Sequence, residues 1–349
     1  MLILLIVKPI LPRLGVLLIA ALGLPAGASS LSDSVVQFAH YDALSSNVIM
    51  AQRLEPPLQV DLAFRAMAQH NQRLADQALD LRSEHFRIFV PARQPAAGYG
   101  LMVFVPPWPG GPYIPPAWRA ALDQRGIIFV TAGQSGNDQP VLGRRDPLAI
   151  LAAINVKKLY RIDPARTFIG GFSGGSKVAF KLAVGYPDLF NGAFLLGGAD
   201  ALGDEAFVPT DRALWARFRA QTRVVYVSGA RDEINVDLAH SSAASLRRFC
   251  AQASEVMIVP GLGHELVDRS QFGRVLDTLD RPPTGQLPSP DKCLAGIDAK
   301  IAAELDAVEA MVARGEHEAA RKQLLKLDAD YGGLALPRSL ALLRRIDGI

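Results

Sequence analysis

The feature that most constrains the fold is a serine flanked by glycines, where an apolar run meets a segment with helical spacing. Gly171 and Gly175 enclose Ser173 in the pattern Gly-x-Ser-x-Gly. Residues 167–169 are aromatic or β-branched and indicate a buried strand, whereas apolar side chains recur at helical spacing over residues 178–186. Ser173 is therefore predicted to lie at a sharp strand-to-helix corner, which requires glycine where the strand and the helix approach each other.

An alternation of strand-like and helical patterns extends over residues 83–280 of the 349-residue chain. The predicted strands are residues 85–90, 101–105, 127–131, 167–172, 193–196, 223–228 and 255–259. The predicted helices are residues 117–123, 147–160, 176–186, 236–250 and 271–279. This order is typical of an α/β fold, in which helices cover both faces of a mostly parallel sheet.

The regions on either side of this core are predicted to be helical or linking. Residues 29–82 form an N-terminal extension with helical apolar spacing at residues 60–79. Residues 281–290 are rich in proline and read as a linker. Residues 291–349 are predicted to form a hairpin-like appendage of two helices, separated at Gly315. A single pair of helices cannot stack into a solenoid of repeated units, so we expect the appendage to dock on the core.

The first 28 residues have the layout of a secretory signal. Lys8 and Arg13 precede a short apolar stretch, and small residues lead to a cleavage site after Ala28. Residues 1–28 are therefore predicted to be a signal peptide, which would direct the protein to the periplasm or the extracellular space. An uncleaved membrane anchor is the alternative, because residues 1–7 are also apolar.

The chain has two cysteines, Cys250 and Cys293. In an exported protein they could form one disulfide that joins the C-terminal appendage to the core. Two unrelated buried thiols are the alternative.

The charge and the motifs exclude several classes of ligand. The net charge is +3, and no basic run with interleaved aromatic residues is present, so no nucleic-acid partner is expected. The Gly-x-x-x-x-Gly-Lys-Ser/Thr pattern of a phosphate-binding loop is also missing from the sequence. No cofactor and no metal is predicted.

A nucleophilic serine needs a histidine to take its proton and a carboxylate to orient that histidine. Of the six histidines, His264 alone lies in a glycine-containing loop directly after the last predicted strand. Asp232 follows the strand before it, so both side chains can reach the sheet edge where Ser173 lies. The alternative acids are Asp200, Glu233 and Asp237.

The negative charge that develops during acyl transfer needs backbone N–H donors. Gly174, directly after the serine, is predicted to supply one of them at the start of the helix. The loop after residues 101–105 should supply the second. Because Pro106 and Pro107 have no N–H, Trp108 is the first available donor there. Together with Tyr113, Trp108 could also line an apolar substrate pocket.

With these residues assembled, the chain resembles the α/β-hydrolase superfamily. Within that superfamily it is similar to secreted esterases such as polyhydroxybutyrate depolymerases and feruloyl esterases. The resemblance covers residues 83–280 and is carried by residues 162–175, 186–194, 229–232 and 263–264. It implies Ser173 as nucleophile, Asp232 as acid, His264 as base, and Trp108 and Gly174 as oxyanion donors. This chain has Pro106-Pro107 where the family usually has His-Gly.

The expected function is that of a serine esterase, a carboxylic-ester hydrolase acting on a small-molecule or polymer-derived ester. Two alternatives remain open at this point. One is a non-catalytic exported binding or assembly protein that keeps the hydrolase fold and contacts a protein partner weakly through its C-terminal helices. The other is a serine peptidase of the same superfamily.

Overall fold

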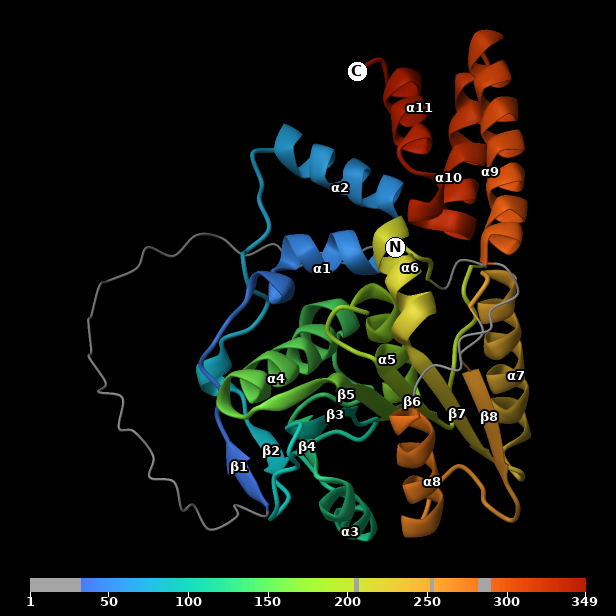
Figure 1. Cartoon of the computed structure of the whole chain (residues 1–349). Coiled ribbons are helices and arrows are strands. Elements are labelled where there is room, and N and C mark those ends of the chain that lie inside the picture. The colour runs from blue at the N-terminus through green and yellow to red at the C-terminus, as the bar shows by residue number, and fades with distance from the viewer. Residues whose placement is uncertain (1–32, 204–206, 252–253, 282–289) are drawn as a thin grey trace, which may run out of the picture.

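The computed structural model describes residues 33–203, 207–251, 254–281 and 290–349 (Figure 1). An eight-stranded sheet lies at its centre, with the strand order β1-β2-β4-β3-β5-β6-β7-β8. The strands are β1 (Ser34–Val36), β2 (Phe86–Phe89), β3 (Tyr99–Val105), β4 (Ile127–Ala132), β5 (Ile162–Phe172), β6 (Gly192–Leu196), β7 (Arg223–Gly229) and β8 (Ser254–Val259). Strands β3 to β8 are parallel, whereas β2 is antiparallel to both β1 and β4. The predicted α/β fold class is confirmed.

Helices cover both faces of the sheet (Figure 1). One face carries α4 (Asp146–Leu159), α5 (Gly174–Gly185), α6 (Arg212–Gln221) and α7 (Glu233–Arg248), and the other carries α3 (Pro116–Arg125) and α8 (Arg269–Asp280). Every residue of β3, β4, β6 and β7 is buried, as expected for strands covered on both sides. Between α3 and α8, the rings of Trp118 and Phe272 stack with their centroids 4.2 Å apart.

The N-terminal region contributes more to the core than the sequence predicts. Strand β1 belongs to the sheet, so residues 29–82 are not merely an extension of it. Two helices follow, α1 (Asn47–Leu54) and α2 (Pro57–Gln69). The helical spacing at residues 60–79 overestimates the second helix, which ends at Gln69. Shortly after it, Asn71 has a φ of 52°.

The C-terminal region contains three helices, α9 (Pro290–Ala313), α10 (His317–Tyr331) and α11 (Arg338–Asp347). The prediction of a two-helix hairpin is therefore wrong, because α11 folds back onto α2 and α10. Single helical turns complete the structure: η1 (Ala43–Ser45), η2 (Leu81–Ser83), η3 (Val141–Arg145) and η4 (Gly332–Ala335). The predicted signal peptide and nearly all of the predicted linker lie outside the described residues. None of the described helices is both long and apolar enough to cross a bilayer.

Specific contacts dock the C-terminal helices on the rest of the chain. Asp328 of α10 is buried and accepts a hydrogen bond from the Leu58 N–H in the first turn of α2, at 3.0 Å. The N–H of Gly333 donates to the Pro209 carbonyl at 2.8 Å. Cys250 and Cys293 form a disulfide with their Cα atoms 5.8 Å apart. The appendage is therefore docked, and it forms a further helical layer beyond α5 and α6 (Figure 1).

Candidate active site

Ser173 lies at the corner between β5 and α5, as the sequence predicts. Its φ of 55° and ψ of −125° are rare for a residue with a side chain, so this backbone is strained. Neighbouring groups hold it there. The Ser173 N–H donates to the Leu196 carbonyl at 2.8 Å, and the Ser176 hydroxyl donates to the Ser173 carbonyl at 2.5 Å. The half-buried serine side chain is thus presented at the carboxyl edge of the sheet.

Two glycines allow this corner to form. A methyl group on Gly171 would lie 2.2 Å from the Gly175 carbonyl, so β5 and α5 touch directly. A methyl group on Gly175 would lie 2.0 Å from the carbonyl oxygen of Val105, the last residue of β3. Any side chain at either position would therefore push the helix away from the sheet. This close approach brings the start of α5 next to the loop that follows β3.

The predicted acid and base are in contact. Asp232 Oδ2 lies 2.6 Å from His264 Nδ1, across the loops that follow β7 and β8. The two loops are tied together, because the Arg231 N–H donates to the Leu262 carbonyl at 3.0 Å. The Asp232 side chain is 12% exposed and that of His264 is 42% exposed. An ionised carboxylate at this distance fixes the proton on Nδ1 and leaves Nε2 free to accept one.

Asn235, which was not among the predicted site residues, completes this contact. Its Nδ2 donates to both carboxylate oxygens of Asp232 at 2.9 Å, and it lies 3.3 Å from His264 Nδ1. Asn235 is three residues after Asp232, in the first turn of α7, where residues at this spacing share a helix face. That spacing was the signal available in the sequence.

The alternative acids take no part in this contact. Asp200 pairs with the Lys177 ammonium group at 2.6 Å. Glu233 and Asp237 are exposed, and among the described residues neither forms a hydrogen bond with His264. The structure therefore brings together Asp232 and His264 and leaves the other carboxylates aside.

The histidine ring packs against the residue that precedes the serine. Its centroid is 4.8 Å from that of Phe172, the residue before Ser173. A methyl group on Gly197 would lie 3.1 Å from the His264 ring and 3.2 Å from the Phe172 ring, so a side chain there would crowd both. No hydrogen bond joins Ser173 Oγ to His264 among the described residues. In ligand-free structures such bonds are commonly long and tighten when substrate binds.

The predicted oxyanion donors come from adjoining segments. Gly174 begins α5, and Trp108 lies in the loop after β3, whose end packs against the start of that helix. The Trp108 ring is half-buried and meets Tyr113 edge-on, with ring centroids 5.7 Å apart. Its Nε1 is buried with no hydrogen-bond partner in the described part of the chain.

A buried arginine holds the loop that carries Trp108. Arg145 is 4% exposed, and its guanidinium donates to the Pro106 carbonyl at 3.1 Å and to the Ser135 carbonyl at 2.9 Å. It thereby links the loops after β3 and β4. Burial lowers the pKa of Arg145 from its usual value, and the nearby carboxylates of Asp146 and Asp138 partly oppose this effect. No sequence pattern distinguishes this arginine from the others.

The next residue, Asp146, is a buried carboxylate. It is fully inaccessible to solvent, and within the described ranges neither of its oxygens has a hydrogen-bond partner. Burial raises the pKa of Asp146 from 3.8 to about 7. The positive charge of Lys181 opposes this shift, and the negative charge of Glu55 adds to it. Ionised Asp146 therefore destabilises the fold, because it loses its hydration without gaining a hydrogen bond.

The raised pKa of Asp146 predicts that the stability of Asp146→Asn, relative to that of the wild-type protein, increases as the pH rises. Between pH 5 and 7 the unfolded chain has already released the Asp146 proton, whereas the folded chain still holds it. Wild-type stability should therefore fall relative to the variant by about 1.4 kcal/mol per pH unit, roughly 3 kcal/mol in total. Above pH 7 the difference should stay constant. Scanning calorimetry at pH 5 and pH 8 measures it, with the exposed Asp138→Asn as control. A difference independent of pH would contradict a raised pKa for Asp146.

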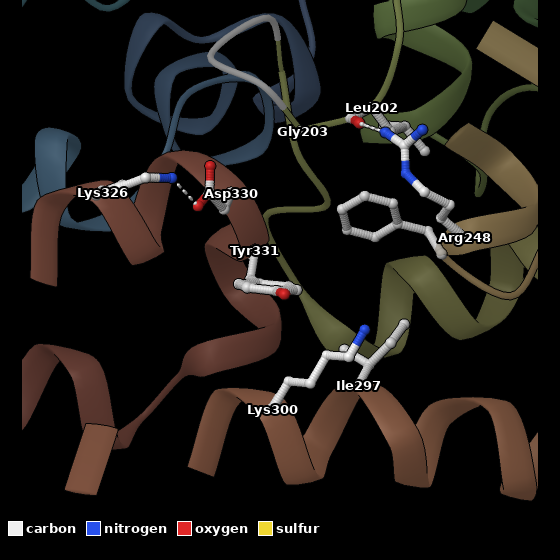
Figure 2. Close-up of a pocket in the computed structure, with 9 residues that line it drawn as sticks. Leu202, Gly203, Arg248, Ile297, Lys300, Lys326, Asp330 and Tyr331 are labelled. Carbon is white, nitrogen blue, oxygen red and sulfur yellow. Dashed lines mark hydrogen bonds and ion pairs between the residues drawn. The ribbon is translucent and has the colours of Figure 1, made fainter. Parts of the chain in front are cut away.

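A pocket of about 240 Å³ lies elsewhere, between the C-terminal helices and the end of α7 (Figure 2). Three of its four charged side chains, Arg248, Lys326 and Asp330, already have partners. Arg248 donates to the Leu202 carbonyl at 3.5 Å, and Lys326 pairs with Asp330 at 2.5 Å. None of the predicted catalytic residues lines this pocket. The candidate active site is therefore at the carboxyl edge of the sheet.

The strand order, the crossing helices and the serine corner together define an α/β-hydrolase fold. Asp232 and His264 lie in the loops after the last two strands, in the order in which this fold carries its acid and histidine. The chain thus has the fold of the α/β-hydrolase superfamily.

Comparisons with known proteins give only distant likenesses. No family model matches the sequence, and no curated protein matches it. Among solved structures, it is similar to an acetyl xylan esterase from Aspergillus awamori, with 14% identity and a TM-score of 0.41 over 56% of this chain and 94% of that one. It is also similar to a thermophilic esterase from Thermogutta terrifontis, with 16% identity and a TM-score of 0.39 over 58% of this chain and 90% of that one.

A third similar structure is a puromycin-hydrolyzing peptidase from Mycobacterium tuberculosis, with 17% identity and a TM-score of 0.40. The match covers 56% of this chain and 36% of the peptidase, so the chain spans about a third of that protein.

Proposed function

We propose that this protein is a serine esterase that cleaves carboxylic esters through an acyl-enzyme on Ser173. The observation that carries the proposal is the 2.6 Å contact between Asp232 and His264, next to a strained serine corner. A carboxylate bound to Nδ1 gives the imidazole the tautomer that can accept a proton at Nε2. A serine exposed on such a corner is the group that this base would activate.

In the first half of the reaction, His264 Nε2 takes the proton from Ser173 Oγ while Oγ attacks the ester carbonyl carbon. The carbonyl oxygen becomes negatively charged and accepts hydrogen bonds from the N–H groups of Trp108 and Gly174. The carbon–oxygen bond to the alcohol then breaks, and His264 gives its proton to the departing alkoxide. An acyl group remains bound to Ser173.

In the second half, a water molecule attacks the acyl carbon as His264 removes one of its protons. The same N–H groups bind the second oxyanion. Ser173 Oγ leaves with the proton from His264, and the carboxylic acid is released. Asp232 keeps its negative charge throughout and stabilises the imidazolium form of His264 in both halves.

Apolar side chains beside these residues favour substrates with an apolar or aromatic group. Tyr113 is 41% exposed and lies against Trp108, and Ile234 is 75% exposed, two residues after Asp232. Exposed apolar side chains next to reactive groups commonly contact ligands. We propose that this activity is exported from the cytosol, and the Cys250–Cys293 disulfide supports such an oxidising location.

Labelling with a fluorophosphonate tests the chemistry without the natural substrate. Such reagents form a stable bond with an activated serine oxygen. We expect stoichiometric labelling of the wild-type protein, located at Ser173 by peptide mass spectrometry, and no labelling of Ser173→Ala. Ester turnover of p-nitrophenyl acetate or butyrate should disappear in proportion to the labelled fraction.

The alternatives give different results in the same assays. A non-catalytic binding protein would not be labelled, and this result would reject the esterase proposal. A peptidase would be labelled but would cleave aminoacyl amides faster than short acyl esters. A side-by-side screen of the two substrate types therefore separates esterase from peptidase.

A further inference from the structure

The loop after β4 places an amide side chain beside both predicted oxyanion donors. A methyl group built on Gly174 would lie 2.3 Å from Asn137 Oδ1 and 3.1 Å from Asn137 Nδ2. The Asn137 carboxamide therefore covers the Cα of the residue that follows Ser173. A side chain at position 174 would push the Asn137 carboxamide away from this place.

The same loop is bonded to the segment that carries Trp108. The Asn137 N–H donates to the Pro107 carbonyl at 2.9 Å. A methyl group on Gly136 would lie 2.4 Å from the Trp108 carbonyl oxygen, so the two loops are in direct contact. Arg145 joins them from the buried side through the Pro106 and Ser135 carbonyls. The backbone of Asn137 is thus tied to the segment that carries Trp108, and its carboxamide lies beside Gly174.

The amide of Asn137 is available to a ligand. The residue is exposed, and in the described portion of the chain its side chain forms no hydrogen bond. Its neighbours differ, since Gln139 Nε2 donates to Asp138 at 2.7 Å. A carboxamide has two N–H donors, and a half turn about its last bond exchanges its nitrogen and oxygen ends.

The proline pair explains why a side-chain donor is useful here. Pro106 and Pro107 have no N–H, so Trp108 offers the first backbone donor after β3. We infer that Asn137 donates a third hydrogen bond to the oxyanion from its side-chain amide, alongside Gly174 and Trp108. This inference rests on the proposed esterase function and adds a catalytic residue to it.

The test compares Asn137→Ala with Gln139→Ala, a matched loss of an amide two residues away in the same loop. Turnover of p-nitrophenyl butyrate gives kcat and KM. Removal of one oxyanion donor typically lowers kcat by about 10²-fold to 10³-fold, so we expect a loss of that size for Asn137→Ala with little change in KM. Gln139→Ala should stay close to wild type in both constants.

A second readout separates donation to the oxyanion from a structural role. A trifluoromethyl ketone forms a hemiketal on the serine, and the oxygen of this adduct occupies the position of the oxyanion. Its inhibition constant should rise by about the same factor as kcat falls, because the analogue resembles the transition state. If Asn137→Ala is insoluble, Asn137→Leu replaces it, since it has a similar size, no charge and no donor.

The outcomes are distinct from those that test the proposed function. Labelling of Ser173 together with unchanged kcat in the Asn137 variant would overturn this inference alone. A fall in kcat with an unchanged inhibition constant would also overturn it and would leave Asn137 a structural role. Absence of both labelling and ester turnover in the wild-type protein would remove the proposed function and this inference together.

Discussion

Ser173→Ala is expected to lower kcat for short p-nitrophenyl esters by about 10⁴-fold to 10⁶-fold. The variant lacks the oxygen that forms the acyl-enzyme, and the remaining groups can only bind substrate and polarise its carbonyl. His264→Ala should cost about as much, because serine and base act as one unit whose losses do not add. Steady-state assays of both single variants and of the double variant measure this.

Folding must be kept separate from chemistry in this experiment. The Ser173 backbone is strained, and its N–H and carbonyl form the hydrogen bonds that hold the corner. Alanine keeps those backbone groups, so the far-ultraviolet circular dichroism and the melting temperature should stay near wild type. Ser241→Ala, an exposed change on α7, serves as the control. More than a tenth of wild-type turnover in Ser173→Ala would reject the proposed nucleophile.

The parts of this fold that the sequence predicts depend on local patterns. The predicted bounds of β3, β4, β6, β7 and β8 agree with the structure within two residues, because local periodicity detects their apolar runs. Strand β5 begins at Ile162, before the predicted start at residue 167, because its first residues are partly polar and lack the apolar signal. The pattern that predicts the serine corner is equally local. Gly171 is required by its close approach to Gly175, four residues later, and Gly175 by its close approach to the end of β3. The pairing of Asp232 with His264 also follows, since both come directly after strands that end at one edge.

Elements that depend on distant partners were not predicted. Strand β1 has only three residues and pairs with β2, about fifty positions further along the chain. The segment expected to extend α2 instead contacts the start of α1, where the Asn47 N–H donates to the Asp76 carbonyl at 2.9 Å. In this second case tertiary hydrogen bonding outweighs a local helical propensity, whereas β1 is too short for its pattern to be detected.

Helix α6 shows a signal that was present but overlooked. Asp211 caps the helix, accepting a hydrogen bond from the Leu214 N–H at 2.8 Å. Trp215 and Phe218 follow at helical spacing and are buried. The intervening arginines obscure this apolar face in the sequence.

The candidate site likewise combines residues that local patterns predict with residues that only tertiary packing brings into place. Asn137 and Arg145 come from the loop after β4 and from the turn before α4, and their places depend on how these segments pack against the loop after β3. No residue spacing encodes such a contact between loops. The structure was therefore needed to find them.

Replacement of the predicted acid, Asp232, is expected to have the second large effect on turnover. Asp232→Asn is expected to lower kcat by about 10⁴-fold, because an amide can donate a hydrogen bond to His264 Nδ1 and thereby place the ring proton on Nε2. In that tautomer the imidazole cannot accept the serine proton. The Asn235 amide would also lose one of the two carboxylate oxygens to which it donates.

Asp200→Asn is the matched control, since it makes the same chemical change at the alternative aspartate that follows the preceding strand, β6. Its partner is Lys177 and the pair is partly exposed, so its loss should change kcat less than about threefold. Equal labelling rates for Asp200→Asn and wild type, with labelling of Asp232→Asn slowed in step with kcat, would connect the effect to serine activation. The reverse result, a large loss at Asp200 and a small one at Asp232, would mean that another carboxylate orients the histidine during turnover. Such a result would require the loop after β6 to release Lys177 and swing toward the ring of His264.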